Sequence, residues 1–350
     1  MPRMLPSLGR SPDNVGTTAV LKGERIYRPL KGLYFAALLR AGHHNRLLRR
    51  LARNDAVLVL LFHHVSPRAN RFWPPLHPGL FDDLLGFLGE TCEVVSLRDL
   101  DQDGARGDGA PKVVLTFDDG FQSFVEYAMP LLTKHRMGAN QNVIAACVQS
   151  GEPPRDMQLY DILASAPAGL VRQLRVPGFE VEADLDDQRR LEIFGVALGE
   201  YLASRSPERR QECWRPIEEL RNRLDSVHET PMMSEREVRE AAGTHEIGVH
   251  SYTHERMDAV SLEGFAEDIE RCSAYFADSL RLSPGTYAFP YGRGRDDQVE
   301  LLRERGFRHV LLTGERASSA RARAHPRLTV RGTTRAEVVL RALGHQPRVP

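Results

Sequence analysis

The sequence lacks any paired cysteine motif. Its four cysteines are far apart, and no Cys-x-x-Cys pair occurs: they are Cys92, Cys147, Cys213 and Cys272. A cysteine-based zinc site is therefore not expected. Isolated cysteines of this kind are typical of small buried side chains, with a disulfide as the alternative.

Long apolar runs are also missing. The longest one near the N-terminus, residues 57–62, has six residues and is far too short to span a bilayer. The first 14 residues, MPRMLPSLGRSPDN, contain no apolar stretch of the kind found in a secretory signal. These absences predict a cytoplasmic protein.

An excess of charge of either sign is absent as well. The chain has 47 basic and 47 acidic residues, so its formal net charge is zero. Proteins that bind nucleic acids usually have a basic excess, and we therefore do not expect a nucleic-acid partner. A local exception is the helix predicted at residues 30–53, which has five arginines. This basic amphipathic helix either contacts an anionic membrane surface or packs on the domain with a solvated arginine face.

The remaining pattern is that of an α/β protein. Short apolar runs alternate with amphipathic helical segments from residue 55 onward, and about seven or eight of these runs are predicted strands. A closed (β/α) barrel is one arrangement of such a pattern. We predict an N-terminal extension at 1–54 and a barrel at 55–345, interrupted by a helical insertion at about 151–235.

Polar residues follow three of the predicted strands. Asp118 and Asp119 come after the run at 113–117, His250 and His254 come after 246–249, and Tyr291 follows 286–289. The carboxyl ends of parallel barrel strands open on one face, so these side chains are expected to converge. Two imidazoles and one carboxylate suit Zn²⁺ or a similar divalent ion, and the second carboxylate would then be available as a general base.

The same residues carry a resemblance. Residues 116–120 (TFDDG), 246–254 (EIGVHSYTH) and 289–292 (FPYG) resemble the first three motifs of the polysaccharide deacetylase family, also called the NodB-homology group or carbohydrate esterase family 4. The lead-in at 62–65 (FHHV) is similar to that of the exopolysaccharide N-deacetylase branch. The resemblance implies a distorted (β/α) barrel with the helical insertion.

The resemblance also implies an activity. This is metal-dependent hydrolysis of an N-acetyl or O-acetyl group on a sugar of a polysaccharide or lipid-linked oligosaccharide. The residues that match metal-ligand positions are Asp119, His250 and His254. Asp118 matches the general base, and Tyr291 matches the residue whose backbone N–H stabilises the oxyanion, in a loop shaped by the substrate-binding Pro290.

Two positions depart from the family pattern. The arginine that often precedes the motif tyrosine by three residues is Ala288 here, so Arg327 and Arg331 are the candidates to support Asp118. No clean match exists for the late histidine that acts as general acid. His325 and His309 are candidates for it, and His63, which follows the first strand, is a further candidate site residue.

Two alternatives to a sugar deacetylase stay open. The same site would suit an amidohydrolase that acts on a non-sugar amide, because a fold does not fix its substrate. Ala288 and the absent late histidine are also compatible with a carbohydrate-binding protein without catalytic activity. Retention of both aspartates and both histidines favours an enzyme.

Overall fold

The fold is built on eight parallel strands. The computed structural model describes residues 27–100, 109–179 and 188–346. The strands within these ranges are β1 Val57–Phe62, β2 Glu93–Val94, β3 Lys112–Phe117, β4 Asn140–Val143, β5 Glu246–Val249, β6 Thr286–Ala288, β7 His309–Thr313 and β8 His325–Thr329.

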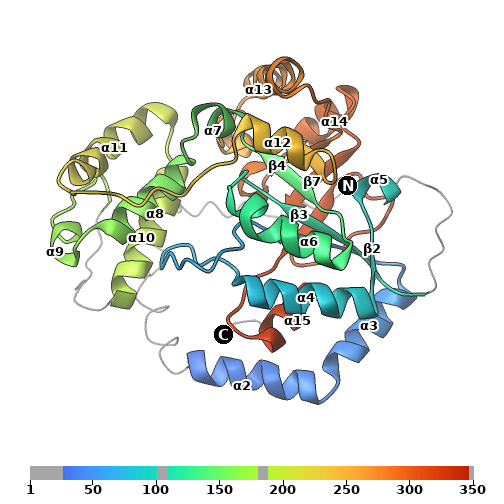
Figure 1. Ribbon diagram of the computed structural model, residues 1–350. Coiled ribbons are helices and arrows are strands. Elements are labelled where there is room, and N and C mark those ends of the chain that lie inside the picture. The colour runs from blue at the N-terminus through green and yellow to red at the C-terminus, as the bar shows by residue number, and fades with distance from the viewer. Residues whose placement is uncertain (1–26, 101–108, 180–187, 347–350) are drawn as a thin grey trace, which may run out of the picture.

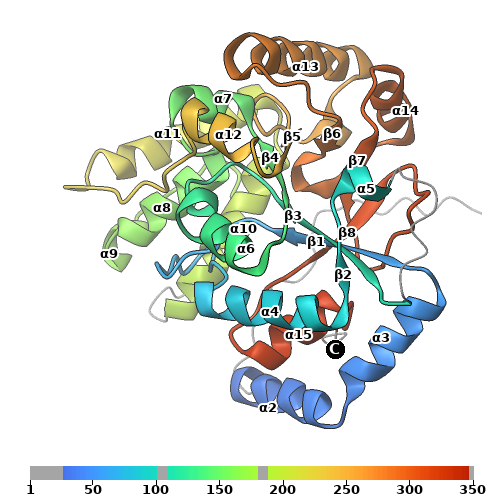
Figure 2. The ribbon, with the colours of Figure 1, turned by 45° about the vertical axis from the view of Figure 1, so that its right-hand side comes forward.

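Seven of these strands close into a barrel. Strand β1 pairs along its whole length with β3 and also pairs with β8, which joins the two ends of the order β1-β8-β7-β6-β5-β4-β3. The ring is distorted at β3, because β2 pairs with the start of β3 while β4 pairs with its end. The predicted (β/α) barrel is confirmed, and its strands lie at the centre of the molecule in Figures 1 and 2.

Helices surround the barrel and bury its outer face. The large apolar core lies between strands and helices, with side chains such as Leu58, Leu115, Phe265 and Val338 fully buried. These covering helices are α4 Pro78–Thr91, α6 Met129–His135, α7 Ala145–Ser150, α12 Glu235–Ala241, α13 Leu262–Tyr275, α14 Asp296–Glu304 and α15 Arg335–Ala342.

A smaller apolar cluster fills the amino-terminal end of the barrel. Helix α5, Leu97–Leu100, places Leu97 and Leu100 against Val59 and Val114. The carboxylate of Glu246 accepts hydrogen bonds from the first backbone N–H groups of α5. This end of the barrel is therefore plugged.

The segment expected as a helical insertion is helical and has its own apolar cluster. Its helices are α8 Arg155–Ser165, α9 Ala168–Val171, α10 Gln188–Ala203 and α11 Pro207–Arg221, which lie together on the left of Figure 1. Leu163, Leu198 and Ile217 from this lobe pack with Phe72 and Phe121 from barrel loops. The lobe is therefore joined to the barrel by shared apolar packing.

The N-terminal segment differs from the single helix predicted at 30–53. It forms two helices, α2 Tyr27–Arg40 and α3 His43–Arg53. The break occurs at Gly42, whose φ of 70° is left-handed and ends the right-handed helix. Phe35 of α2 packs on Ala336 and Leu340 of α15, which fixes the pair against the barrel wall. The first 26 residues of the expected extension lie outside the described residues.

The sequence also favours a strand at residues 142–148, and this expectation is wrong. The strand spans Asn140–Val143, and a helix, α7, begins at Ala145. The error arose because Asn140 and Gln141 are polar, although both are fully buried in the sheet.

Within the described residues, no helix is both long and apolar enough to span a membrane.

Candidate metal centre and active site

Three strands deliver the candidate catalytic residues to one end of the barrel. Asp118 and Asp119 directly follow β3, His250 directly follows β5, and Tyr291 is three residues beyond β6. Because β3, β5 and β6 belong to one parallel barrel, their carboxyl ends share one face. The structure therefore brings together residues separated by more than 130 positions in the chain.

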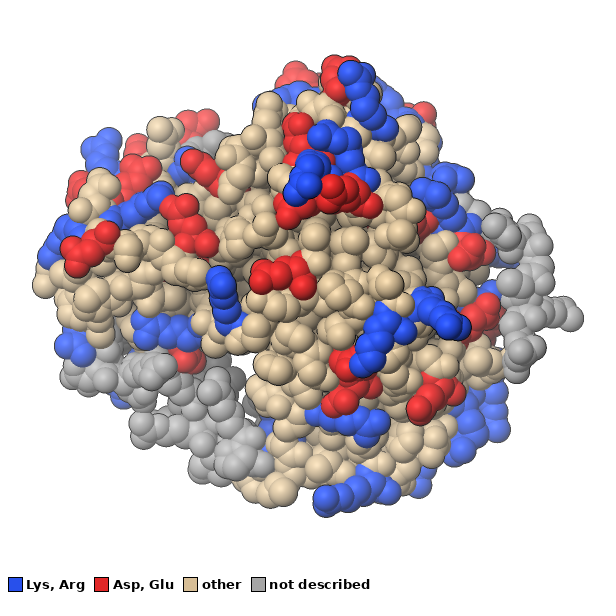
Figure 3. Space-filling model, in the orientation of Figure 1, with Lys and Arg blue, Asp and Glu red and all other residues tan. Residues whose placement is uncertain are grey.

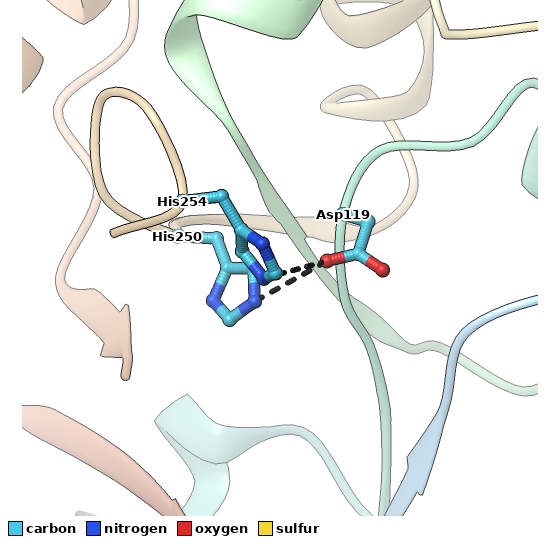
Figure 4. A group of neighbouring side chains, drawn as sticks. All are labelled: Asp119, His250 and His254. Carbon is cyan, nitrogen blue, oxygen red and sulfur yellow. Dashed lines mark ion pairs between the residues drawn. The ribbon is translucent and has the colours of Figure 1, made fainter. Parts of the chain in front are cut away.

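Asp119, His250 and His254 form a compact group of side chains. Asp119 Oδ1 lies 3.4 Å from His250 Nε2 and 3.5 Å from His254 Nε2. One ligand atom from each residue lies within 4.8 Å of the other two. Figure 4 shows both imidazole rings turned toward the same carboxylate oxygen. In the described parts of the chain, this is the only group of three or more such residues with metal-binding geometry.

The donor atoms of this group are prepared for a divalent ion. His250 Nδ1 donates a hydrogen bond of 2.8 Å to the Ala288 carbonyl, which leaves Nε2 with its lone pair. Asp119 Oδ1 is buried and has no hydrogen-bond partner. A buried carboxylate oxygen without a partner is costly, and a cation between it and the two imidazoles would remove that cost. The residues present therefore fit a metal ion.

The charge state of Asp119 also suits a ligand. Burial would raise the pKa of this carboxyl, but the close approach of the His250 imidazole and the charge of His254 oppose it and lower the pKa to about 2. Asp119 is therefore ionised throughout the neutral range. A metal ligand must be in this deprotonated form.

Asp118 has a different environment and a different partner. Arg327 of β8 donates two hydrogen bonds to it, from Nη1 to Oδ1 at 2.7 Å and from Nη2 to Oδ2 at 2.6 Å. The amide of Asn142 donates a third, to Oδ1 at 2.8 Å. Asp118 and Arg327 are both almost completely buried. A paired geometry of this kind fixes the carboxylate plane as well as its position.

Burial would raise the pKa of Asp118, but the Arg327 guanidinium and the charge of His250 outweigh it and hold the pKa below its usual range. The carboxylate is thus ionised and rigid. Its Oδ2 lies 3.8 Å from His250 Nε2, beside the metal-binding group but outside it. A charged acceptor next to a metal position is the arrangement needed to take a proton from a reacting water.

The backbone around the site is strained. Four of the seven described non-glycine residues with positive φ are here: Asp119 at 76°, Ser251 at 60°, His254 at 64° and Tyr291 at 56°. Each left-handed residue costs free energy that other contacts must offset, on the order of 1 kcal/mol. In the loop after β5, the Ser251 hydroxyl accepts a hydrogen bond from the His254 N–H at 2.9 Å. Strain concentrated in this way is typical of functional sites.

Tyr291 and Pro290 lie beside the metal-binding group. The Tyr291 ring is 4.9 Å from the His254 ring, centroid to centroid, and about a third of the residue is exposed to solvent. Pro290 is buried and begins the short turn Pro290–Gly292. This turn therefore places the Tyr291 ring against His254.

The histidines named from the sequence fall into two groups. His63 faces the site: burial lowers its pKa, and the charges of Asp119 and Asp118 oppose that effect. His309 and His325 are the first residues of β7 and β8 and lie buried at the amino ends of these strands. His325 Nδ1 is 2.9 Å from the Ser318 hydroxyl. The structure does not bring these two histidines to the end of the barrel that carries the metal-binding group.

Three further residues at the site were not identified from the sequence. Asn142 supports Asp118, as described above. Asp156 of the helical lobe has Oδ2 3.8 Å from His254 Nδ1. Arg210 of the lobe donates two hydrogen bonds of 2.7 Å to Glu255, which follows His254 in the chain. For Asn142, the sequence offered one signal, the run of amides in β4. For Asp156 and Arg210 it offered none, because only the tertiary fold brings them close to the site.

Comparison with known proteins agrees with this geometry. Residues 224–310 match the family model described as polysaccharide deacetylase. The matched segment contains His250, His254 and Tyr291, whereas Asp118 and Arg327 lie outside it. No curated protein matches the sequence of the chain.

Solved structures share the fold. Streptococcus pyogenes deacetylase PplD in complex with acetate aligns with a TM-score of 0.54 at 15% identity, over 83% of this chain and 99% of that one. IcaB from Ammonifex degensii aligns with a TM-score of 0.50 at 20% identity, over 83% and 97%. BC0361, a polysaccharide deacetylase from Bacillus cereus, aligns with a TM-score of 0.51 at 12% identity, over 82% and 69%.

Proposed function

We propose that this chain is a polysaccharide deacetylase, a metal-dependent hydrolase of N-acetylated sugars, and the matched segment and the barrel support this proposal. The bond cleaved is the amide between the acetyl group and the sugar nitrogen, and an O-acetyl ester is the related substrate. The sugar belongs to a polysaccharide, such as an exopolysaccharide, or to a lipid-linked oligosaccharide.

The division of labour between Asp118 and Asp119 carries this proposal. The two carboxylates are adjacent in the chain, yet one is held by Arg327 and the other faces two imidazoles. Hydrolysis of an amide requires both a proton acceptor and an electrophilic centre that polarises the carbonyl group. A protein that only binds carbohydrate needs neither arrangement.

The roles of the chain's residues follow from their positions. Asp119, His250 and His254 would hold the divalent ion, and Zn²⁺ is our expectation because imidazole and carboxylate suit it. When bound, the ion would supply Lewis-acid polarisation of the acetyl carbonyl. Asp118 would accept the proton of the attacking water, in the orientation fixed by Arg327.

The opposite side of the opening would stabilise negative charge. Tyr291 stands next to His254, and its backbone N–H is our candidate donor to the developing oxyanion. His63 is the candidate to protonate the leaving nitrogen, because it faces the same carboxylates and directly follows β1. Pro290 would limit the movement of the loop that carries Tyr291.

Acetate release is the decisive measurement. The purified chain, loaded with Zn²⁺, should release acetate from at least one member of a panel of N-acetylated oligosaccharides, and a chelator should abolish the release. N-acetylated peptides and O-acetylated sugars in the same panel test the amidohydrolase and esterase alternatives. Absence of acetate from every carbohydrate, with the metal bound, would contradict the proposal.

The structure removes one of the observations that favoured a carbohydrate-binding protein without catalytic activity. That alternative rested partly on Ala288, which removed the arginine expected to support the base. Arg327 supplies a guanidinium to the same carboxylate from a different strand. The base is therefore held in place despite the substitution.

A further inference from the structure

The N-terminal helix pair has two exposed faces that the catalytic site does not use. Figures 1 and 2 show α2 and α3 at the lower border of the molecule, outside the helices that cover the barrel. One face is apolar and belongs to α2, and the other is cationic and belongs to α3. We call them together the α2–α3 surface, defined by Leu30, Leu33, Tyr34, Arg46, Arg49, Arg50 and Arg53.

The apolar face of α2 turns away from the barrel at Leu30 and Leu33, and Tyr34 lies at its edge, where its hydroxyl is 3.0 Å from His345 Nε2. Leu30, Leu33 and Tyr34 are 51%, 66% and 43% exposed, which makes them three of the six large apolar or aromatic residues with the greatest exposure in the described chain. Their spacing of three and four residues places them on one side of the helix. Phe35 points inward and is fully buried against α15. The apolar stripe therefore remains exposed after α2 has packed on α15.

The cationic face lies on α3. Arg46, Arg49, Arg50 and Arg53 are all exposed, and the same helical spacing aligns them. The opposite side of α3 is held by leucines that pack on the core: Leu47, Leu48 and Leu51. Figure 3 shows basic side chains gathered at the lower right of the molecule, where α3 lies in Figure 1.

These arginines have no acidic partner among the described residues. Together with Asn54 they line a shallow hollow of about 510 Å³ that contains no carboxylate. By contrast, Lys31 of α2 is paired with Glu337 at 2.6 Å. The α3 arginines are thus available to anionic groups such as lipid phosphates.

We propose that the α2–α3 surface docks the protein on an anionic phospholipid bilayer, with the α2 stripe inserted at the headgroup boundary and the α3 arginines on lipid phosphates. The surface of an anionic bilayer offers apolar and anionic groups side by side over a large area, which matches both faces of the helix pair. A nucleic acid would match the arginines but not the exposed leucines. The inference does not depend on the proposed catalytic function.

Co-sedimentation of the full chain with vesicles tests the proposal. The chain should bind vesicles of phosphatidylcholine mixed with phosphatidylglycerol, with weaker binding at higher salt, and should not bind phosphatidylcholine alone. Equal binding to both vesicles, or to neither, would overturn the proposal. A chain that instead forms a dimer which Leu33→Gln dissociates, or that binds DNA and not vesicles, would also overturn it.

Matched variants locate the contact. Arg49→Gln/Arg50→Gln should lower the partition coefficient roughly 30-fold, since each basic side chain near an anionic surface contributes about fivefold. Arg215→Gln/Arg303→Gln removes the same charge from two other exposed arginines and should leave binding unchanged. All four side chains are exposed, so these variants should keep the unfolding temperature of the parent protein.

The apolar stripe has its own pair of variants. Leu33→Gln should lower the partition coefficient by about tenfold, because an inserted leucine leaves water. Leu262→Gln changes another exposed leucine, on α13, and serves as the control. If the arginine or the leucine variant of α2–α3 binds as the parent does, the docking surface is not the one proposed.

Discussion

Arg327 donates a hydrogen bond to each carboxylate oxygen of Asp118, although the two residues are 209 positions apart in the chain. This contact defines what Asp118 can do. A carboxylate held at two points cannot rotate toward the metal position, so it does not become a fourth ligand. Its Oδ2 stays beside the metal-binding group, 3.8 Å from His250 Nε2.

The first prediction concerns this pair. Arg327→Lys keeps the charge but replaces a two-point contact by a single one. We expect kcat to fall by about 100-fold or more, because the base would lose its orientation. The bound metal, measured by atomic emission, should remain at the parental level. Parental kcat in this variant would show that the orientation of Asp118 is unimportant.

The second prediction separates base from ligand. Asp118→Asn keeps the shape of the side chain but removes its capacity to accept a proton. Hydrolysis should fall by a factor on the order of 10² to 10⁴, while the metal content stays the same. Full activity in this variant would mean that another residue is the base.

The third prediction concerns the metal. The parental chain should hold about one divalent ion, and His254→Ala should lose it, because a ligand is removed. His228→Ala serves as the control, since this histidine is exposed and is not part of the metal-binding group. Unchanged metal content in His254→Ala would contradict the ligand assignment.

The fourth prediction concerns Gly248. A Cβ atom at this position would lie 2.0 Å from the Oδ1 atom of Asn142, whose amide also binds Asp118. Gly248→Ala should therefore displace Asn142 and lower both activity and the free energy of unfolding, the latter by about 1–3 kcal/mol. Adding Asn142→Ala should restore stability but not activity. Additive losses of stability in the double variant would refute this coupling.

The fifth prediction concerns pH. Burial lowers the pKa of His64 from its ordinary 6.5 to about 4, and its ring stacks on Phe121 and contacts the Ser123 hydroxyl. Because the folded protein binds this proton more weakly than the unfolded chain, His64 stabilises the fold fully above pH 6.5. This contribution is lost progressively as the pH falls toward 4.

His64→Gln removes the titrating group and keeps a hydrogen-bonding side chain. The unfolding temperature of the variant should decrease less than that of the parent between pH 6.5 and 4. Parallel curves for the two proteins would show that His64 does not contribute to the pH dependence.

The barrel strands could be predicted from the sequence where their buried residues are apolar. Residues 57–62 are a continuous apolar run, and all six are buried in β1 as such a run predicts. The same reasoning does not find strand β4, because its first three residues are amides although all three side chains are buried. Apolar patterning cannot find a strand whose interior positions serve a polar site.

The residues of the candidate site could likewise be predicted from the sequence only in part. The aspartates and histidines could be named because each follows a strand, whereas the choice between Arg327 and Arg331 depended on where β8 ends. The strand stops at Thr329, so Arg327 points into the barrel and Arg331 is exposed beyond it. One strand boundary therefore decided which arginine supports Asp118.

The contribution of the helical lobe could not be foreseen either. Asp156 and Arg210 lie in segments without ligand spacing, and they approach His254 and Glu255 only through the packing of α8 and α11 over the barrel. Contacts of this kind depend on the relative placement of two apolar clusters. Periodicity along the chain contains no information on that placement.

The position of Arg327 in β8 also sets an order of events during synthesis. By residue 254 a nascent chain has both aspartates and both histidines, but the guanidinium that aligns Asp118 arrives more than 70 residues later. That strand is also the one that joins β7 to β1 and completes the ring. All four residues are thus present in a chain that lacks its last strand, whereas the alignment of Asp118 requires the completed barrel.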